Sequence, residues 1–172
     1  MTLLRSGRHG GVNSRALFQT GAALVVAIVV FLATQNWVRD LEVNVVVGLL
    51  GPLLPDSLLG AGSNIVVVPR DGLPFLAEVR PSCSAAGAVV ALGVLGSFIA
   101  RAGRVKATLA AVAVVAIGNL VRIGGSIGVG VIYGKSSLVL FHDAAGGAFT
   151  FVYLMVGFAT YLWFTLPKQA KC

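Results

Sequence analysis

Residues 17–37, LFQTGAALVVAIVVFLATQNW, form a continuous, mostly apolar stretch near the start of the 172-residue chain. A helix needs roughly 20 mostly apolar residues to cross the hydrocarbon core of a bilayer, and this stretch is long enough. Arg5, Arg8 and Arg15 precede it, and no A-x-A cleavage site follows it. The length of the apolar run and the missing cleavage site favour an uncleaved first transmembrane helix over a signal peptide.

The composition of the whole chain supports the same class. Hydrophobic residues make up 57% of the chain and charged residues 11%, which is too little charge to cover a water-soluble domain of this size. The net charge of +7 is then a topology signal, because no interleaving of basic and aromatic residues indicates nucleic-acid binding. The two cysteines are far apart and predict neither a disulfide framework nor a metal pair. We therefore predict an all-α integral membrane protein, a single domain over residues 1–172, with the lipid bilayer as a partner and with no metal or cofactor.

Three further segments are predicted to span the membrane: residues 84–100, 107–133 and 143–166. The first of these is short but continuously apolar. The second is interrupted by the glycine-rich sequence GNLVRIGGSIGVG, and the third ends in aromatic residues typical of a membrane interface. With residues 17–37, these segments make about four transmembrane helices.

The segment 43–60 is apolar, but Pro52, Pro55 and Asp56 interrupt it after too few residues to span. If it does not cross, residues 1–16, the Arg101–Lys106 connection and the tail 167–172 all lie on one side. That side carries eight basic residues and none of the acidic ones: Arg5, Arg8, Arg15, Arg101, Arg104, Lys106, Lys168 and Lys171. The six acidic residues fall on the other side or at its boundary: Asp40, Glu42, Asp56, Asp71, Glu78 and Asp143. The positive-inside rule thus predicts cytoplasmic termini and a re-entrant or interfacial helix at 43–60 on the outer face.

Residues 63–82 are predicted to lie outside as a small hairpin. Two short strand-like runs, Ile65–Val68 and Phe75–Val79, flank the sequence PRDGLP, and Asp71-Gly72 between such runs is a hairpin signal. An ordinary external loop is the open alternative, because short apolar runs are ambiguous.

This topology brings three reactive side chains to one depth near the outer surface. Cys83 lies at the outer end of the second span and His142 at the outer start of the fourth. Arg122 lies about 15 residues into the third span, or roughly 23 Å into a core of about 30 Å. An arginine in a span costs about 2.5–3.5 kcal/mol, so it is expected to have a partner or a task.

Each of these residues also has a purely structural interpretation. A lone cysteine such as Cys83 is more often a small buried hydrophobe than a nucleophile, and a histidine at a helix mouth is often an interfacial polar group. Asn119 and Ser126 share a helical face with Arg122. That polar strip is either accessory to a site or simply a hydrogen-bonding contact between helices.

Together the three residues are suited to nucleophilic chemistry. Cysteine attacks as a thiolate, which a neighbouring cation or histidine favours. His142 would take the thiol proton and later protonate a leaving amine, while Arg122 would stabilise the thiolate or an oxyanion. Asp143 is placed as accessory, because neighbouring residues on a helix point about 100° apart. Cys172, at the predicted cytoplasmic terminus, is given no role.

These three motifs, EVRPSCSAAG, GNLVRIGGS and LFHDAAGG, resemble those of the exosortase/archaeosortase family of membrane-embedded cysteine transpeptidases. The resemblance covers roughly residue 41 to the C-terminus, and its catalytic cysteine, arginine and histidine match Cys83, Arg122 and His142. Ala85 replaces the family's usual glycine after Cys-Ser, and the chain has fewer predicted spans than many relatives.

The resemblance implies protein sorting at the outer face of a prokaryotic plasma membrane. Substrates would be exported proteins with a C-terminal tail of recognition motif, transmembrane helix and basic cluster. They would be cut through a thioester and transferred to an amine, or to an acceptor on a lipid or glycan. The alternative is a small non-enzymatic membrane protein, either a transporter or channel in which Arg122 binds an anion or an assembly subunit.

Overall fold

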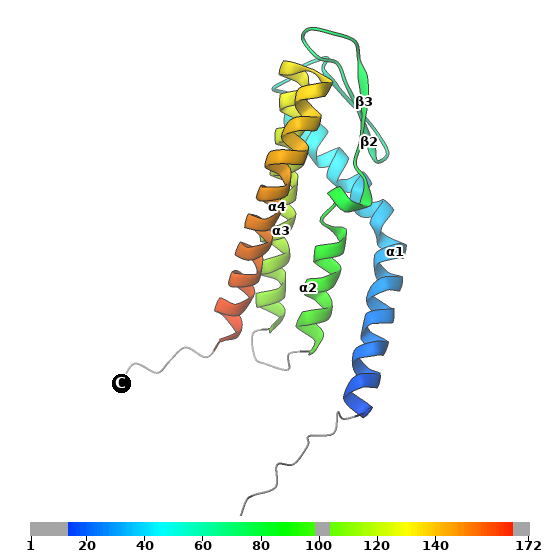
Figure 1. Ribbon diagram of the computed structural model, residues 1–172, viewed down its shortest axis with the longest axis vertical. Coiled ribbons are helices and arrows are strands. Elements are labelled where there is room, and N and C mark those ends of the chain that lie inside the picture. Colours follow the sequence, from blue (N-terminus) through cyan, green and yellow to red (C-terminus); the bar gives the residue numbers. More distant parts are fainter. Residues whose placement is uncertain (1–13, 99–103, 167–172) are drawn as a thin grey trace, which may run out of the picture.

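The structure, a computed structural model, describes residues 14–98 and 104–166. This part of the chain is mostly helical and carries one small sheet (Figure 1). In chain order the elements are α1 (Ser14–Leu50), β1 (Leu58–Ala61), β2 (Asn64–Val67), β3 (Phe75–Glu78), the 3₁₀-helix η1 (Pro81–Cys83), α2 (Ala86–Phe98), α3 (Arg104–Tyr133) and α4 (Lys135–Thr165). Residues 1–13, 99–103 and 167–172, with the basic residues predicted to be cytoplasmic there and Cys172, lie outside the described residues.

Three helices of the described chain are long and apolar enough to cross a membrane: α1 from Thr20 onward, α3 and α4. They include most or all of the predicted spans 17–37, 107–133 and 143–166. The predicted span 84–100 corresponds to α2, whose 13 residues measure only about 20 Å, less than the thickness of the hydrocarbon core. Four spanning helices were predicted, and three reach that length in the part of the chain described.

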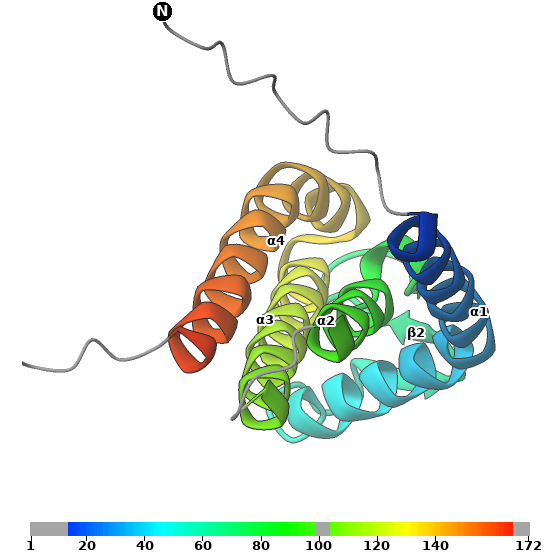
Figure 2. The ribbon, with the colours of Figure 1, turned by 90° about the horizontal axis from the view of Figure 1, so that it is seen from below.

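The prediction of a separate re-entrant or interfacial helix at residues 43–60 is wrong. α1 continues to Leu50, because residues 38–50 contain no proline that would stop a helix. Gly51 and Pro52 follow its end, and residues 51–57 form turns and bends. The last part of the predicted helix is instead strand β1. Figures 1 and 2 show the C-terminal part of α1 slanting toward α3.

The predicted hairpin at residues 63–82 is present and is part of a larger sheet. β2 and β3 pair antiparallel, and Gly72 in their connection has a φ of 121°, which favours glycine. β1, which the sequence pattern did not indicate, pairs antiparallel with the other side of β2 through a turn in which Gly62 has a φ of 59°. The strand order is β1-β2-β3, so β1 and β3 are the edges.

The sheet is fixed to the helices by one buried apolar cluster. Ile65 and Val67 of β2 are fully buried in it. Buried residues of α1 and α3 complete the contact: Val43, Val46, Ile123, Ile127 and Val131. The sheet therefore has a defined position at one end of the helices (Figure 1).

α3 and α4 pack closely along their length. A Cβ atom at Gly118 would lie 2.5 Å from Cβ of Tyr153, and one at Gly157 would lie 2.7 Å from Val115 Cγ2. Only glycine fits at such distances, and small residues let two helix backbones approach.

α4 begins at Lys135 rather than at residue 143 as predicted. Gly134, with a φ of 83°, separates α3 from α4, and residues 135–142 contain neither glycine nor proline. His142 therefore lies about two turns inside α4 instead of at its start.

Candidate active site

Cys83 is held on a short turn between the sheet and α2. Pro81 opens η1, and the Cys83 N–H donates to the Arg80 carbonyl at 2.8 Å. The Ser84 hydroxyl then accepts the Ala86 N–H at 3.2 Å, at the start of α2. The half-buried thiol thus sits at the sheet end of α2, as the sequence predicted.

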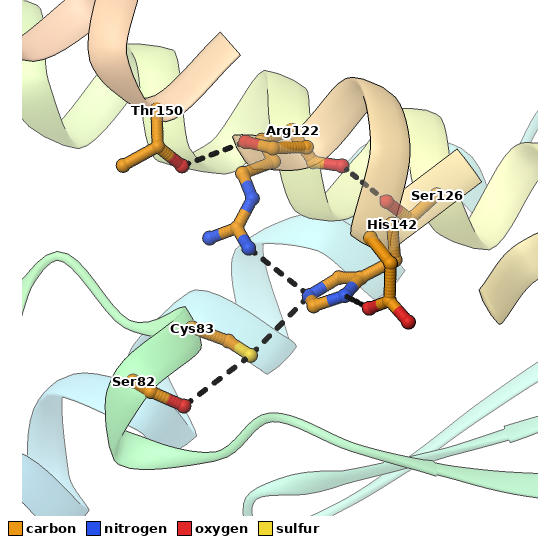
Figure 3. A network of polar contacts seen from close by, with 8 residues as sticks. Ser82, Cys83, Arg122, Ser126, His142 and Thr150 are labelled. Carbon is orange, nitrogen blue, oxygen red and sulfur yellow. Dashed lines mark hydrogen bonds and ion pairs between the residues drawn. The ribbon is translucent and has the colours of Figure 1, made fainter. Parts of the chain in front are cut away.

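The structure brings the three predicted catalytic side chains together (Figure 3). Cys83 Sγ lies 3.3 Å from His142 Nε2. The Arg122 guanidinium reaches the same nitrogen, with Nη2 at 3.1 Å from Nε2. η1, α3 and α4 each supply one member, so residues far apart in the sequence meet at a single imidazole nitrogen.

These contacts determine which imidazole nitrogen carries the proton. A guanidinium only donates hydrogen bonds, so Nε2 of His142 must present its lone pair to Arg122. The ring hydrogen is then on Nδ1, which donates to Asp143 Oδ1 at 3.0 Å. The Cys83 thiol lies within hydrogen-bond distance of the same Nε2.

Asp143 contacts His142 although the two are neighbours on one helix. Its side chain is 73% exposed, whereas that of His142 is 31% exposed. A solvated carboxylate orients the ring less firmly than a buried one would, since water screens it. The geometry therefore suits the accessory role that the sequence suggested for Asp143.

Arg122 has little room for its side chain. It is 9% exposed, and its Nε has no partner among the described residues. A Cβ atom at Gly146, one turn beyond His142 in α4, would lie 3.0 Å from that Nε. Gly146 thus provides the space in which the guanidinium reaches His142, a role that spacing alone did not reveal.

The two other residues of the predicted polar strip do not touch the thiol or the guanidinium. The Ser126 hydroxyl donates to the Arg122 carbonyl at 2.9 Å, a bond within α3. Asn119 is fully buried, accepts the Tyr153 hydroxyl at 3.1 Å and donates to Glu42 at 2.9 Å. Both lie on the buried face of α3, as predicted, but their contacts are structural.

Glu42 is the residue that sequence reasoning missed. It was interpreted as an outer-face charge, yet it is 6% exposed. Its Oε1 accepts two hydrogen bonds, from the Ala85 N–H at 2.9 Å and from Asn119 Nδ2 at 2.9 Å. It therefore joins α1 and α3 to the backbone just beyond Cys83, where a carboxylate also interacts favourably with the start of a helix.

A cleft of about 550 Å³ opens onto the thiol and the imidazole. β3 forms one wall with all four of its residues, and the first turns of α4 form the other with Lys135, Leu138 and Val139. Cys83 and His142 also line this cleft. The Cys83 thiol and the His142 ring therefore lie on a cleft beside β3.

Within residues 14–98 and 104–166, His, Cys, Asp and Glu form no group of three suited to a metal ion. Comparisons with protein-family models, with curated proteins and with solved structures found no match.

Proposed function

We propose that the protein is a cysteine transpeptidase embedded in a membrane and similar to the exosortases and archaeosortases. The observation that carries the proposal is the pair of contacts at His142 Nε2, with the Cys83 thiol at 3.3 Å and the Arg122 guanidinium at 3.1 Å. A thiol beside a base, with the base oriented by a third group, is the arrangement of an activated nucleophile.

The first step is proton transfer from Cys83 Sγ to His142 Nε2. The thiolate then attacks the carbonyl carbon of a peptide bond, an S–C bond forms, and the carbonyl oxygen becomes an oxyanion. His142 returns the proton to the nitrogen of the leaving amine as the C–N bond breaks, which is general acid–base catalysis by one residue in two directions. The product of this half-reaction is a thioester on Cys83.

Arg122 would change partners during this step. Once Nε2 of His142 is protonated, it can no longer accept a hydrogen bond from the guanidinium. The Arg122 N–H groups are then available to the thiolate and to the oxyanion, at the moment when negative charge develops. A donor directed at such an oxyanion is worth about 10²–10³ in rate.

In the second half-reaction an amine, or another nucleophile on a lipid or glycan, attacks the thioester carbonyl. The new bond to the acceptor forms as the C–S bond breaks, and His142 takes the acceptor proton and returns it to the thiolate. The substrates in this proposal are exported proteins whose tail holds a recognition motif, a transmembrane helix and a basic cluster. The site would then lie at the outer face of a prokaryotic plasma membrane, with both chain termini in the cytoplasm.

Hydroxylamine tests the thioester directly, because it attacks thioesters at neutral pH and so replaces the natural acceptor. We expect membranes that contain the protein to release exported proteins shortened at the C-terminus and ending in a hydroxamate, detected by mass spectrometry. Cys83→Ala should abolish this product and Cys83→Ser should nearly do so, because an alcohol is poorly ionised at neutral pH.

Cys172→Ala, which removes the other cysteine of the chain, is the matched control and should behave as the wild type. The proposal is overturned if Cys83→Ala still yields the hydroxamate, or if the shortened proteins never carry it.

A further inference from the structure

β3 has a free edge, and the register of the sheet shows which backbone groups it presents. The Val79 N–H donates to the Ser63 carbonyl at 2.9 Å, which continues the β2–β3 ladder beyond Glu78. Hydrogen-bonded and non-bonded pairs alternate along an antiparallel ladder. Phe75 and Ala77 therefore bond to β2, whereas Leu76 and Glu78 direct their N–H and C=O groups away from the sheet.

The opposite side of β2 gives the same assignment independently. The Val68 N–H donates to the Ser57 carbonyl at 2.8 Å, in register with the β1–β2 ladder. By the same alternation, the backbone N–H and C=O groups of Asn64 and Val66 point toward β1. Those of Ile65 and Val67 therefore point toward β3. In the part of the chain that the structure describes, no backbone group bonds to the outward N–H or C=O of Leu76 or Glu78.

This free edge faces the cleft that contains the reactive thiol. Successive side chains of a strand point to opposite faces, so a strand that lined the cleft by one face would contribute every second residue. All four residues of β3 line the cleft, so β3 lines it with its edge and not with one face. Unpaired main-chain donors and acceptors thus lie along one wall of the cleft that Cys83 and His142 also line.

We infer that the cleft binds an extended polypeptide segment, which adds to β3 as a further strand of the sheet. The inference rests on the proposed function and deepens it, since it states how the substrate main chain is held. Four paired residues would extend about 13 Å. Leu138 and Val139 of α4 would line the other side of the bound segment.

The direction of the added strand follows from the position of β3. β3 descends from the far end of the sheet toward η1 and α2 (Figure 1). A substrate whose own transmembrane helix follows its recognition motif would run the same way, so the new strand is parallel to β3. Its carbonyl end then reaches Cys83.

Peptidyl chloromethyl ketones test this inference without turnover, because the thiolate displaces chloride and is alkylated irreversibly. The probes are acetyl-tetraalanine chloromethyl ketone and acetyl-alanine chloromethyl ketone, applied to the full chain carrying Cys172→Ala and followed by mass spectrometry at Cys83. We expect the tetrapeptide to react about tenfold faster, because it alone can make several main-chain hydrogen bonds to β3.

Leu76→Pro removes an outward N–H of β3 and leaves the β2 ladder intact, since prolines are tolerated on the free side of edge strands. We expect it to cut the tetrapeptide advantage to about threefold or less. Leu76→Ala, the matched control, shortens the same side chain but keeps the N–H and should preserve the advantage.

Methylating the peptide's amide nitrogens one at a time tests the same contact without changing the protein. Strand addition requires that methylation slow the reaction at every second position, because the N–H groups of a strand alternate in direction. Equal reactivity of the two probes, or methylation effects with no alternation, would overturn the inference.

Failure of this inference and failure of the proposed function are distinguishable. Iodoacetamide, which makes no strand contacts, reports separately on the thiol and should alkylate Leu76→Pro at the wild-type rate. A length-independent reaction would remove strand addition and leave the transpeptidase proposal standing. A clear length advantage in a protein that forms no hydroxamate would remove the transpeptidase and keep the peptide-binding cleft.

Discussion

The side chains of the candidate site meet at a single nitrogen, Nε2 of His142. It faces both the thiol of Cys83 and the guanidinium of Arg122, and its one lone pair serves both. In the proposed mechanism the guanidinium leaves Nε2 when the thiol proton arrives there. This role depends on the direction of an N–H group as much as on charge.

Arg122→Lys separates positioned catalysis from simple charge. Lysine keeps the charge but replaces the planar fork with a compact ammonium, and the two are not interchangeable at a directed site. We expect Arg122→Lys to lose substrate cleavage almost as severely as Arg122→Ala, by about 10²–10³. Immunoblots of exported substrates measure the cleavage, with the membrane level of each variant checked.

The double variant Cys83→Ala/Arg122→Ala tests whether the two residues act in the same reaction. Members of one catalytic unit are strongly non-additive, so removing Arg122 after Cys83 should cost little more. Near-normal cleavage by Arg122→Lys would contradict a directed role and would leave the arginine as a charge rather than a positioned catalytic group.

The sequence predicted that Cys83, Arg122 and His142 lie at one depth, and the structure brings them together, but the sequence did not indicate the residues around them. An arginine in an apolar helix is conspicuous because it is costly, and the order of cysteine, arginine and histidine motifs drew attention to the other two. Glu42 carried no such signal, since an acidic residue after an apolar run is typical of an exposed flank. Only the path of α1 shows that this carboxylate lies against Ala85 and Asn119.

At the scale of the element, the errors came from helix boundaries. The segment 43–60 was predicted as a separate helix, yet residues 38–42 contain no proline and α1 runs through them to Leu50. The N-terminal turns of α4 were missed because the sequence there, KSSLVLFH, is less apolar than the rest of the helix. Both boundaries depend on tertiary packing, which hydropathy does not capture.

Two adjacent glycines of α4 offer a matched test of how this helix positions Arg122. Gly146→Ala would put a methyl group 3.0 Å from Arg122 Nε, so the side chain must move, whereas a methyl group at Gly147 would meet no atom within 4 Å. We expect Gly146→Ala to lower cleavage about tenfold, since small misplacements at a reacting centre are costly. The measurement is the initial rate of substrate cleavage in membranes.

Gly147→Ala should cleave at close to the wild-type rate, because it makes the same change in helix propensity without the contact. Equal rates for the two variants would show that the position of the guanidinium does not depend on Gly146.

In the whole molecule, the long apolar helices carry the small sheet at one end (Figure 1). Three helices have the length and composition to cross a membrane, and the cleft that Cys83 and His142 line lies beside β3 of this sheet. Composition alone predicted apolar, membrane-spanning helices, because the shortage of charged residues is visible without any packing detail. The third strand and the cleft beside β3 required the fold, since they depend on which segments meet in space.

If Cys83 cuts the C-terminal tails of exported proteins, the C-termini of those proteins must change when Cys83 is removed. Mass spectrometry would compare them in cells that carry the wild type or Cys83→Ala at equal membrane levels. We expect a set of exported proteins that end before their C-terminal apolar helix in the wild type and retain that helix in Cys83→Ala. Identical C-termini in the two strains would contradict it.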